Sequence, residues 1–184
     1  MNQETFDINH RLIEKCREGD MKAQFMLYKN YSKAMYNIAI RITGNGMDAE
    51  DILQESFVTA FGRLGELGST ASFTSWLKRI VINNSISFVR KRRLIFDDLT
   101  FQEPEADDDP GPEIDIDPAL VHEAIKALPD GSRTILVLYA LEGYRHREIA
   151  EMMEISESTS KSQYRRALTL LRERLLKKTV NEKY

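Results

Sequence analysis

The sequence predicts an all-α protein made of two small helical domains that are joined by a flexible acidic linker. Apolar residues recur at helical spacing through most of the 184 residues, and no stretch alternates convincingly between apolar and polar side chains as a strand does. Prolines and acidic residues interrupt this periodicity near the middle of the chain. We therefore expect a first domain over residues 1–95, a linker over residues 96–117 and a second domain over residues 118–184.

The charge of the chain is distributed unevenly. The formal net charge is −3, but residues 97–117 hold ten of the 29 acidic residues and no basic one. The other 19 acidic residues face 26 lysines and arginines, which leaves both domains mildly basic. Mild basicity predicts little about partners. The acidic linker favours solubility, and a second interpretation is that it mimics nucleic acid and keeps the free protein off DNA.

Cysteine usage and hydropathy indicate the compartment. The single cysteine, Cys16, cannot form an internal disulfide, and we expect it to be a small buried side chain. No apolar run approaches the length that crosses a membrane, and the N-terminus lacks the basic and apolar segments of a signal peptide. We expect a cytoplasmic protein with no membrane insertion.

Three helices are expected in the first part of the first domain. The first covers residues 8–18, and the second covers residues 20–43 with its opening aspartate as N-cap. Residues 44–46, Gly-Asn-Gly, break the helical pattern. Asp48 is then expected to cap the third helix, with Asp51 at its third position as in a capping box.

The third helix carries an acidic face. Asp48, Asp51 and Glu55 lie at positions i, i+3 and i+7. Acidic residues in a first turn complement the helix dipole, by about 0.3–1 kcal/mol each. This effect does not account for Glu55, which lies two turns into the helix with no base three or four residues away. A protein-docking face and a plain solvated face explain the pattern equally well.

A loop and a basic helix follow. Glycines and serines make residues 65–73 unsuited to a helix, and Ser72 or Thr74 can begin the next one, which runs to about residue 93. The face opposite its apolar stripe carries basic, amide and hydroxyl side chains: Lys78, Arg79, Asn83, Ser87 and Arg90. Such a face can contact phosphates and base edges, although its spacing alone favours simple solvation.

The second domain is expected to contain four helices. They cover residues 119–127, 133–141 and 145–153, and a last helix follows Ser156 as its cap. Asp130 or Ser132 is expected to cap the second of them. The last two helices are joined by a short turn and have an alanine where they cross, which is the helix-turn-helix pattern.

The last helix separates its side chains into two faces. One is expected to be apolar and consists of Tyr164, Ala167, Leu168, Leu171 and Leu175. The other lies near the helix N-terminus and consists of Ser158, Lys161, Ser162, Arg165 and Arg166. Hydroxyls and cations at this place suit entry into a DNA major groove. The alternative is an ordinary amphipathic surface helix.

Motifs in both halves resemble those of the extracytoplasmic-function sigma factors of bacterial RNA polymerase. DAEDILQE and SFTSWLKRIVINN, at residues 48–55 and 72–84, look like the family's second domain. REIAEMMEIS and STSKSQYRRAL, at residues 147–156 and 158–168, look like its fourth domain. A helix-turn-helix alone is a weak signal, but the motifs in this order and size are specific.

The resemblance implies a role for each motif. Core polymerase would bind Asp48, Asp51, Gln54 and Glu55. An unstacked base of the −10 promoter element would enter the loop at residues 67–72, including Ser69 and Thr70, beside Lys78, Arg79 and Asn83. The −35 element would be contacted by Ser158, Lys161, Ser162, Arg165 and Arg166, with Arg145, His146 and Thr159 near its phosphates. The implied partners are core polymerase, promoter DNA and an anti-sigma factor.

Four positions depart from the family pattern. Glu154 occupies the turn position where glycine is usual, and a left-handed backbone there costs a non-glycine residue about 1 kcal/mol or more. Ser160 replaces a buried valine, and Gln163 and Leu168 replace frequent arginines. These changes leave the fold intact and affect the −35 sequence preference.

Two other function classes compete with the sigma-factor interpretation. A conventional helix-turn-helix regulator with an N-terminal sensor or dimerisation domain is the alternative, but it gives the acidic face and the loop with its basic helix no task. An enzyme has little support, because the sequence has no glycine-rich phosphate loop, no nucleophile–base signature and no metal-spaced ligands. We expect no catalytic residue, metal or cofactor.

Overall fold

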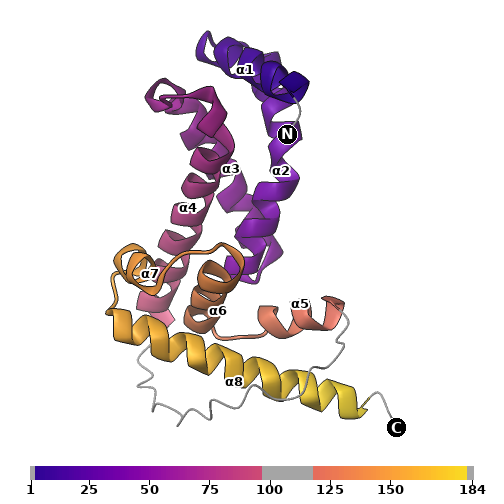
Figure 1. Cartoon of the computed structure of the whole chain (residues 1–184), viewed down its shortest axis with the longest axis vertical. Coiled ribbons are helices and arrows are strands. Elements are labelled where there is room, and N and C mark those ends of the chain that lie inside the picture. The colour runs from indigo at the N-terminus through magenta and orange to yellow at the C-terminus, as the bar shows by residue number, and fades with distance from the viewer. Residues whose placement is uncertain (1–2, 97–117, 182–184) are drawn as a thin grey trace. The chain divides into compact units, whose positions relative to one another are not determined.

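The computed structural model describes residues 3–96 and 118–181 as eight α-helices, two 3-10 turns and one π-helical turn, with no strand among these residues (Figure 1). The all-α prediction is confirmed. The chain forms two compact units, Met1–Ser87 and Phe88–Tyr184. The expected linker lies outside the described residues except for Phe96. No described helix is long and apolar enough to cross a membrane.

The first unit is built from α1 (Gln3–Arg17), α2 (Met21–Thr43), α3 (Gly46–Gly62) and most of α4 (Phe73–Phe96). The expected cap of α2 is confirmed, since the Asp20 carboxylate accepts hydrogen bonds from the N–H groups of Lys22 and Ala23 at 2.8 and 3.2 Å. The core contains these fully buried side chains: Ile13, Leu27, Ile42, Leu77, Val81 and Ile82. Cys16 is also buried, as expected.

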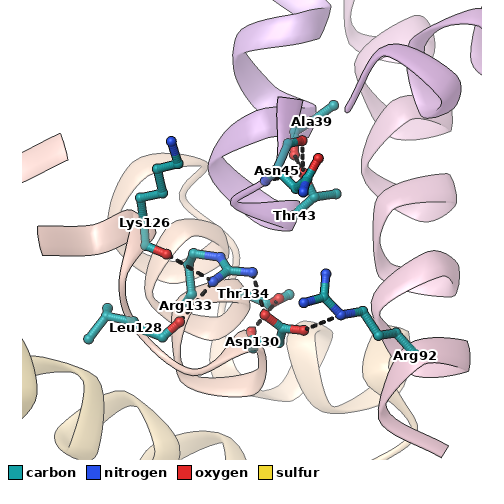
Figure 2. A network of polar contacts seen from close by, with 9 residues as sticks. All are labelled: Ala39, Thr43, Asn45, Arg92, Lys126, Leu128, Asp130, Arg133 and Thr134. Atoms are coloured by element: carbon teal, nitrogen blue, oxygen red, sulfur yellow. Dashed lines mark hydrogen bonds and ion pairs between the residues drawn. The ribbon is translucent and has the colours of Figure 1, made fainter. Parts of the chain in front are cut away.

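The cap predicted for α3 is wrong. Asn45, not Asp48, is the N-cap, and its side-chain oxygen accepts from the N–H groups of Met47 and Asp48 at 2.8 and 3.2 Å. Thr43 fixes the connection, because its hydroxyl oxygen lies 3.0 Å from Ala39 O and 3.1 Å from Asn45 O (Figure 2). Gly44 turns the chain with φ of 70°, so one extended residue suffices before helix geometry resumes.

Residues 65–73 are more regular than the sequence predicts. Two 3-10 turns, η1 (Leu64–Glu66) and η2 (Thr70–Ser72), lie on either side of Leu67, Gly68 and Ser69. Short i to i+3 turns tolerate the glycines and serines that disfavour a full α-helix. Leu64 and Leu67 are 2% and 4% exposed, so this connection is fastened to the core by its leucines.

The second unit arranges α5 (Pro118–Lys126), α6 (Asp130–Leu136) and α7 (His146–Met153) along the long helix α8 (Glu157–Asn181) (Figure 1). A π-helical turn, η3 (Val137–Leu141), continues α6. The expected side-chain cap of α6 is absent, because Pro129 precedes the helix. The Asp130 carboxylate instead accepts a 2.6 Å hydrogen bond from Arg133.

Arg133 closes the turn between α5 and α6. Its side chain is 4% exposed. Its Nη1 donates to the carbonyl oxygens of Lys126 and Leu128 at 3.2 and 2.8 Å, and its Nη2 donates to Asp130 (Figure 2). A buried guanidinium is stable only when its donors are satisfied. Arg133 therefore fixes the turn from inside the unit.

Candidate protein and nucleic-acid interfaces

The acidic face of α3 is exposed. Asp51, Gln54 and Glu55 are exposed, and Asp48 is half-buried. Neither Asp51 nor Glu55 takes part in an ion pair with another described residue. Two acidic side chains kept in solvent without a counter-charge add little to stability, so the face is available to a partner.

Two apolar side chains that the sequence did not indicate as part of an interface also lie on this face. Met47 is 77% exposed and Val58 is 73% exposed. With Asp51 and Gln54 they lie at positions i, i+4, i+7 and i+11 of the helix, which is one stripe. Both residues fall outside the buried stripe of α3, and this position in the sequence could have indicated that they are exposed. We call this stripe, together with the neighbouring Asp48 and Glu55, the acidic stripe of α3; an apolar residue at each of its ends is typical of an interface with a hydrophobic contribution.

A groove continues the acidic face toward α2. It has a volume of about 560 Å³ and is lined by Tyr28, Ser32, Lys33 and Tyr36 of α2 and Glu50, Leu53 and Gln54 of α3. Gln54 belongs both to the groove and to the acidic stripe. A docking partner on α3 can therefore extend its contact onto α2.

The loop at residues 67–72 presents small side chains beside α4. Gly68, Ser69, Ala71 and Ser72 are exposed. Thr70 is half-buried, and its hydroxyl lies 2.8 Å from Nδ1 of His10 in α1. The loop backbone closes through a 3.0 Å bond from Ser72 N–H to Ser69 O. Ser69 is therefore open to a ligand, whereas Thr70 already has a protein contact.

The basic face of α4 lies where the sequence places it. Arg79 and Asn83 are exposed and Lys78 is half-buried. The rotation of the helix is fixed by Asn84, whose amide donates a 3.0 Å hydrogen bond to the buried hydroxyl of Ser56 in α3. The loop runs directly into α4, so the small side chains and the cations belong to one continuous stretch of chain.

The turn between α7 and α8 has the geometry that the sequence predicts. Glu154 adopts the left-handed conformation with φ of 54°, the one non-glycine residue to do so in the described part of the chain. The Ile155 N–H donates to Ala150 O at 3.0 Å, which closes the end of α7. Ser156 caps α8 as expected, since its hydroxyl accepts from the Thr159 N–H at 3.0 Å.

The two faces of α8 differ in part from the prediction. Ser158, Lys161 and Arg165 are exposed on one stripe as expected. Leu168 was expected in the apolar stripe, and this is wrong, because it is 43% exposed and continues the polar stripe. Arg166 lies to the side, half-buried, with its Nη1 atom hidden from solvent.

The remaining −35 candidates surround this stripe. Arg145 is exposed at the start of α7, while Thr159 and Ser162 are half-buried. The Ser162 hydroxyl donates to Thr159 O at 3.1 Å. Lys161 forms a 2.7 Å ion pair with Glu157, and this hydrogen bond lowers the pKa of the Glu157 carboxyl. Lys161 must leave or share Glu157 before it contacts DNA.

A polar and aromatic cluster holds α8 against the rest of the second unit. The His146 ring stacks on Tyr139 with centroids 4.2 Å apart, and both rings contact Tyr164. His146 Nδ1 lies 3.0 Å from the hydroxyl of Ser160, which is fully buried. Burial and the nearby Lys161 lower the pKa of His146, against a smaller opposing effect of Glu157.

Side-chain contacts within the second unit explain two departures from the family pattern. Ser160 replaces an apolar residue because its hydroxyl has a partner in His146. Gln163 faces inward, where its side-chain oxygen accepts a 2.7 Å hydrogen bond from Ser132 in α6. Both residues position α8 and are not free to read DNA. Among the described residues, no group of three or more side chains is arranged to hold a metal ion.

The comparisons with known proteins agree with this arrangement. Residues 27–95 match the family description Sigma-70 region 2, and residues 119–171 match Sigma-70, region 4. The chain is 30% identical over 154 residues to the RNA polymerase sigma factor SigV of Bacillus subtilis, covering 83% of this chain and 90% of that protein. It is 29% identical to the RNA polymerase sigma-H factor of Pseudomonas aeruginosa, covering 89% and 91%.

A solved structure has the same fold. The sigma factor RpoE from Bartonella quintana, crystallised with the anti-sigma factor NepR, matches with a TM-score of 0.52 and 22% identity. The match covers 82% of this chain and 94% of that one. The alternative of an N-terminal sensor or dimerisation domain is not supported, because most of the first unit matches Sigma-70 region 2, which covers residues 27–95.

Proposed function

Because this chain belongs to the extracytoplasmic-function group of bacterial RNA polymerase sigma factors, we propose that its two domains divide promoter recognition between them. As a member of this group the protein is a transcription initiation factor that binds core polymerase and promoter DNA, and it is not an enzyme. Residues 1–95 bind core polymerase and open the −10 element. Residues 118–184 bind the −35 element, and residues 96–117 link the two. The protein works in the cytoplasm.

The acidic stripe of α3 is the docking site for core polymerase. The observation that carries this proposal is the exposure of Asp51 and Glu55 without an ion-pair partner among the described residues. Gln54 and Asp48 border them, and Met47 and Val58 supply apolar contacts at the ends. A basic or amide-rich surface on the polymerase would satisfy the carboxylates while the apolar ends exclude water.

The remaining candidates are divided between the two promoter elements. Ser69 and Thr70 of the loop, with Lys78, Arg79 and Asn83 of α4, enclose an unstacked −10 base and hold its backbone. Ser158, Lys161 and Arg165 of α8 enter the major groove at the −35 element. Arg145, Thr159, Ser162 and Arg166 support these contacts from the edge of the stripe. An anti-sigma factor is a further partner, as in the complex of RpoE with NepR.

The docking proposal is tested by charge reversal. Asp51→Lys with Glu55→Lys should abolish binding to purified core polymerase in a competition assay. The matched control is Glu123→Lys with Glu173→Lys, which makes the same change of charge at exposed positions of the second unit. The control should bind normally. Equal binding by both double variants contradicts the docking site, and equal loss by both means that net charge rather than the face is recognised.

A further inference from the structure

We propose that helix α1 is a positioning element for base capture, in which Arg17 and His10 hold the loop at residues 67–72 in its receptive shape. This inference rests on the proposed role of that loop. Helix α1 precedes the residues that match Sigma-70 region 2, which begin at residue 27. The contacts that tie it to the loop are specific to these side chains.

The Arg17 guanidinium is the main tie. Its Nη2 donates a 2.6 Å hydrogen bond to Leu67 O, and its Nε donates to Leu64 O at 3.3 Å. Its Nη1 is paired with Glu14 of α1 at 2.9 Å. The planar guanidinium thus donates to three acceptors at once. Glu14 orients it, and two backbone carbonyl oxygens accept its other hydrogen bonds.

The backbone around Gly68 needs these external donors. Leu64 O already accepts from the Leu67 N–H at 3.2 Å, which closes the turn η1. The next backbone closure is the bond from Ser72 to Ser69 in η2. Between the two turns the chain crosses Gly68, whose lack of a side chain leaves it many conformations. Arg17 fixes the chain at the residue just before this glycine.

His10 fixes the chain on the other side of Gly68. Its Nδ1 lies 2.8 Å from the hydroxyl of Thr70, the first residue of η2. Arg17 and His10 are seven residues apart, which is two helical turns, so both lie on the same face of α1. One face of α1 therefore holds the chain on both sides of Gly68.

Helix α1 is itself held firmly by the core. Ile13 is fully buried and Cys16 is 4% exposed, on the side of α1 that packs into the first unit. Arg17 follows Cys16 directly, so its position is set by this packing. Ser69 and Ala71 remain exposed in the held loop. The tie thus shapes the loop and leaves the Ser69 side chain open to a base, while His10 shares the hydroxyl of Thr70.

Arg17→Met is the variant that removes the tie while keeping an unbranched side chain for packing. The control is Arg63→Met, which deletes the same charge beside η1 but breaks only an exposed ion pair with Glu66. Arg17→Lys keeps the charge and can reach one carbonyl, so it should restore part of the effect. All variants are made in the full-length protein and bound to core polymerase.

Two measurements are made on each variant. The first is hydrogen exchange of the loop amides by mass spectrometry on the free protein. The second is the preference of the holoenzyme for a single-stranded −10 oligonucleotide over the same oligonucleotide with one abasic position. For Arg17→Met we expect loop exchange about tenfold faster and a preference reduced by about tenfold, as for a lost charged hydrogen-bond pair. Arg63→Met should match the wild type in both.

Each result decides between the two proposals. Unchanged loop exchange in Arg17→Met overturns the tie, whatever the oligonucleotide shows. Faster exchange with an unchanged preference overturns the positioning role. A wild type that itself shows no preference for the intact oligonucleotide overturns the proposed base capture, while the exchange data still test the tie.

Cys16 reports whether the variant merely loosens the unit. Burial, with a smaller effect of Asp20, raises the pKa of its thiol to about 11, so labelling at pH 8 should be slow while α1 stays in place. Labelling of Arg17→Met as slow as that of the wild type supports a local tie. Fast labelling means that Arg17 holds α1 in the fold, and this overturns the proposal.

Discussion

Each unit uses one arginine to hold a turn, and the two arginines differ in burial. Arg17 donates to Leu64 O and Leu67 O with its side chain 31% exposed. Arg133 donates to two carbonyls and to Asp130 with its side chain 4% exposed. Water can replace the donors of Arg17 if it leaves, but it cannot easily reach the buried carbonyl oxygen of Leu128 that Arg133 satisfies.

The same difference separates the two candidate DNA segments. The loop at residues 67–72 has only the short turn η2 to shape it, so it depends also on side chains from α1. Helix α8 is shaped by its own backbone and is positioned by the part-buried contacts of Ser160 and Gln163. We infer that the first unit can lose function while staying folded, whereas damage to the second unit lowers stability together with function.

The largest expected effect is the difference in stability loss between variants of the two arginines. Arg133→Met should lower the stability of the second unit by about 3 kcal/mol, because it leaves the carbonyl oxygens of Lys126 and Leu128 without this donor and leaves Asp130 with its ion pair to Arg92 alone. Arg17→Met should cost the first unit only about 1.4 kcal/mol, the equivalent of its tenfold faster loop exchange, since its partners can turn to water. Hydrogen exchange of the core amides of Leu138 and Val81, followed in urea, measures the two losses separately. Equal losses contradict the comparison.

A second prediction concerns function without stability in the first unit. Arg79→Ala with Asn83→Ala should prevent melting of the −10 element, seen as lost permanganate reactivity of its thymines. Core binding and the unfolding midpoint should stay unchanged, because both side chains are exposed. A template with a pre-opened bubble should restore transcription in part, since the few kcal/mol of unstacking are then supplied. Normal melting of closed duplex DNA by the double variant would mean that this face of α4 is only solvated and does not contact the −10 element.

A third prediction separates two adjacent arginines of α8. Arg165→Ala should cost about 1–3 kcal/mol of discrimination between −35 sequences, because the residue lies on the exposed stripe. Arg166→Ala should mainly lower the unfolding midpoint, since this side chain is half-buried. Binding of a −35 sequence library by each full-length variant gives the discrimination. If both variants lose affinity equally for all sequences, the two arginines contact phosphates.

The smallest expected effect is the pH dependence of the second unit. Burial lowers the pKa of His146 in the folded state, so the unfolded chain binds a proton first as the pH falls. The contribution of neutral His146 to stability is complete above its ordinary pKa of 6.5 and is lost as the pH falls through the lowered value. Lys161 opposes the imidazolium, Glu157 favours it, and Tyr139, Tyr164 and Ser160 complete its surroundings.

His146→Phe provides the matched control for this effect. Phenylalanine keeps a ring beside Tyr139 but cannot titrate. The difference in urea midpoint between wild type and His146→Phe should therefore change between pH 8 and pH 5, and core amides of the first unit should show no such difference. A constant difference across this range contradicts the assignment of the effect to His146.

Local signals in the sequence determined the helices and most of the faces. The cap at Asp20, the breaks at Gly44 and Gly143 and the left-handed Glu154 depend on a few neighbouring residues. The acidic stripe of α3 and the basic face of α4 depend on helical spacing alone. The family motifs could be recognised in the sequence because each lies within one helix or across one short turn.

Only the tertiary structure decided which polar groups are partners. Arg17 meets Leu67 across 50 residues, and His10 meets Thr70 across 60. Nothing near either residue in the sequence indicates such a contact. The cap of α3 was predicted wrongly because Asn45, Asp48 and Asp51 all have suitable side chains. The left-handed backbone at Gly44 lets the helix begin directly after Asn45, which makes Asn45 the cap. Leu168 was misplaced because α8 packs along a narrower stripe than its leucines predict. Helical spacing fixes which residues share a face, but packing against other helices fixes how much of that face is buried.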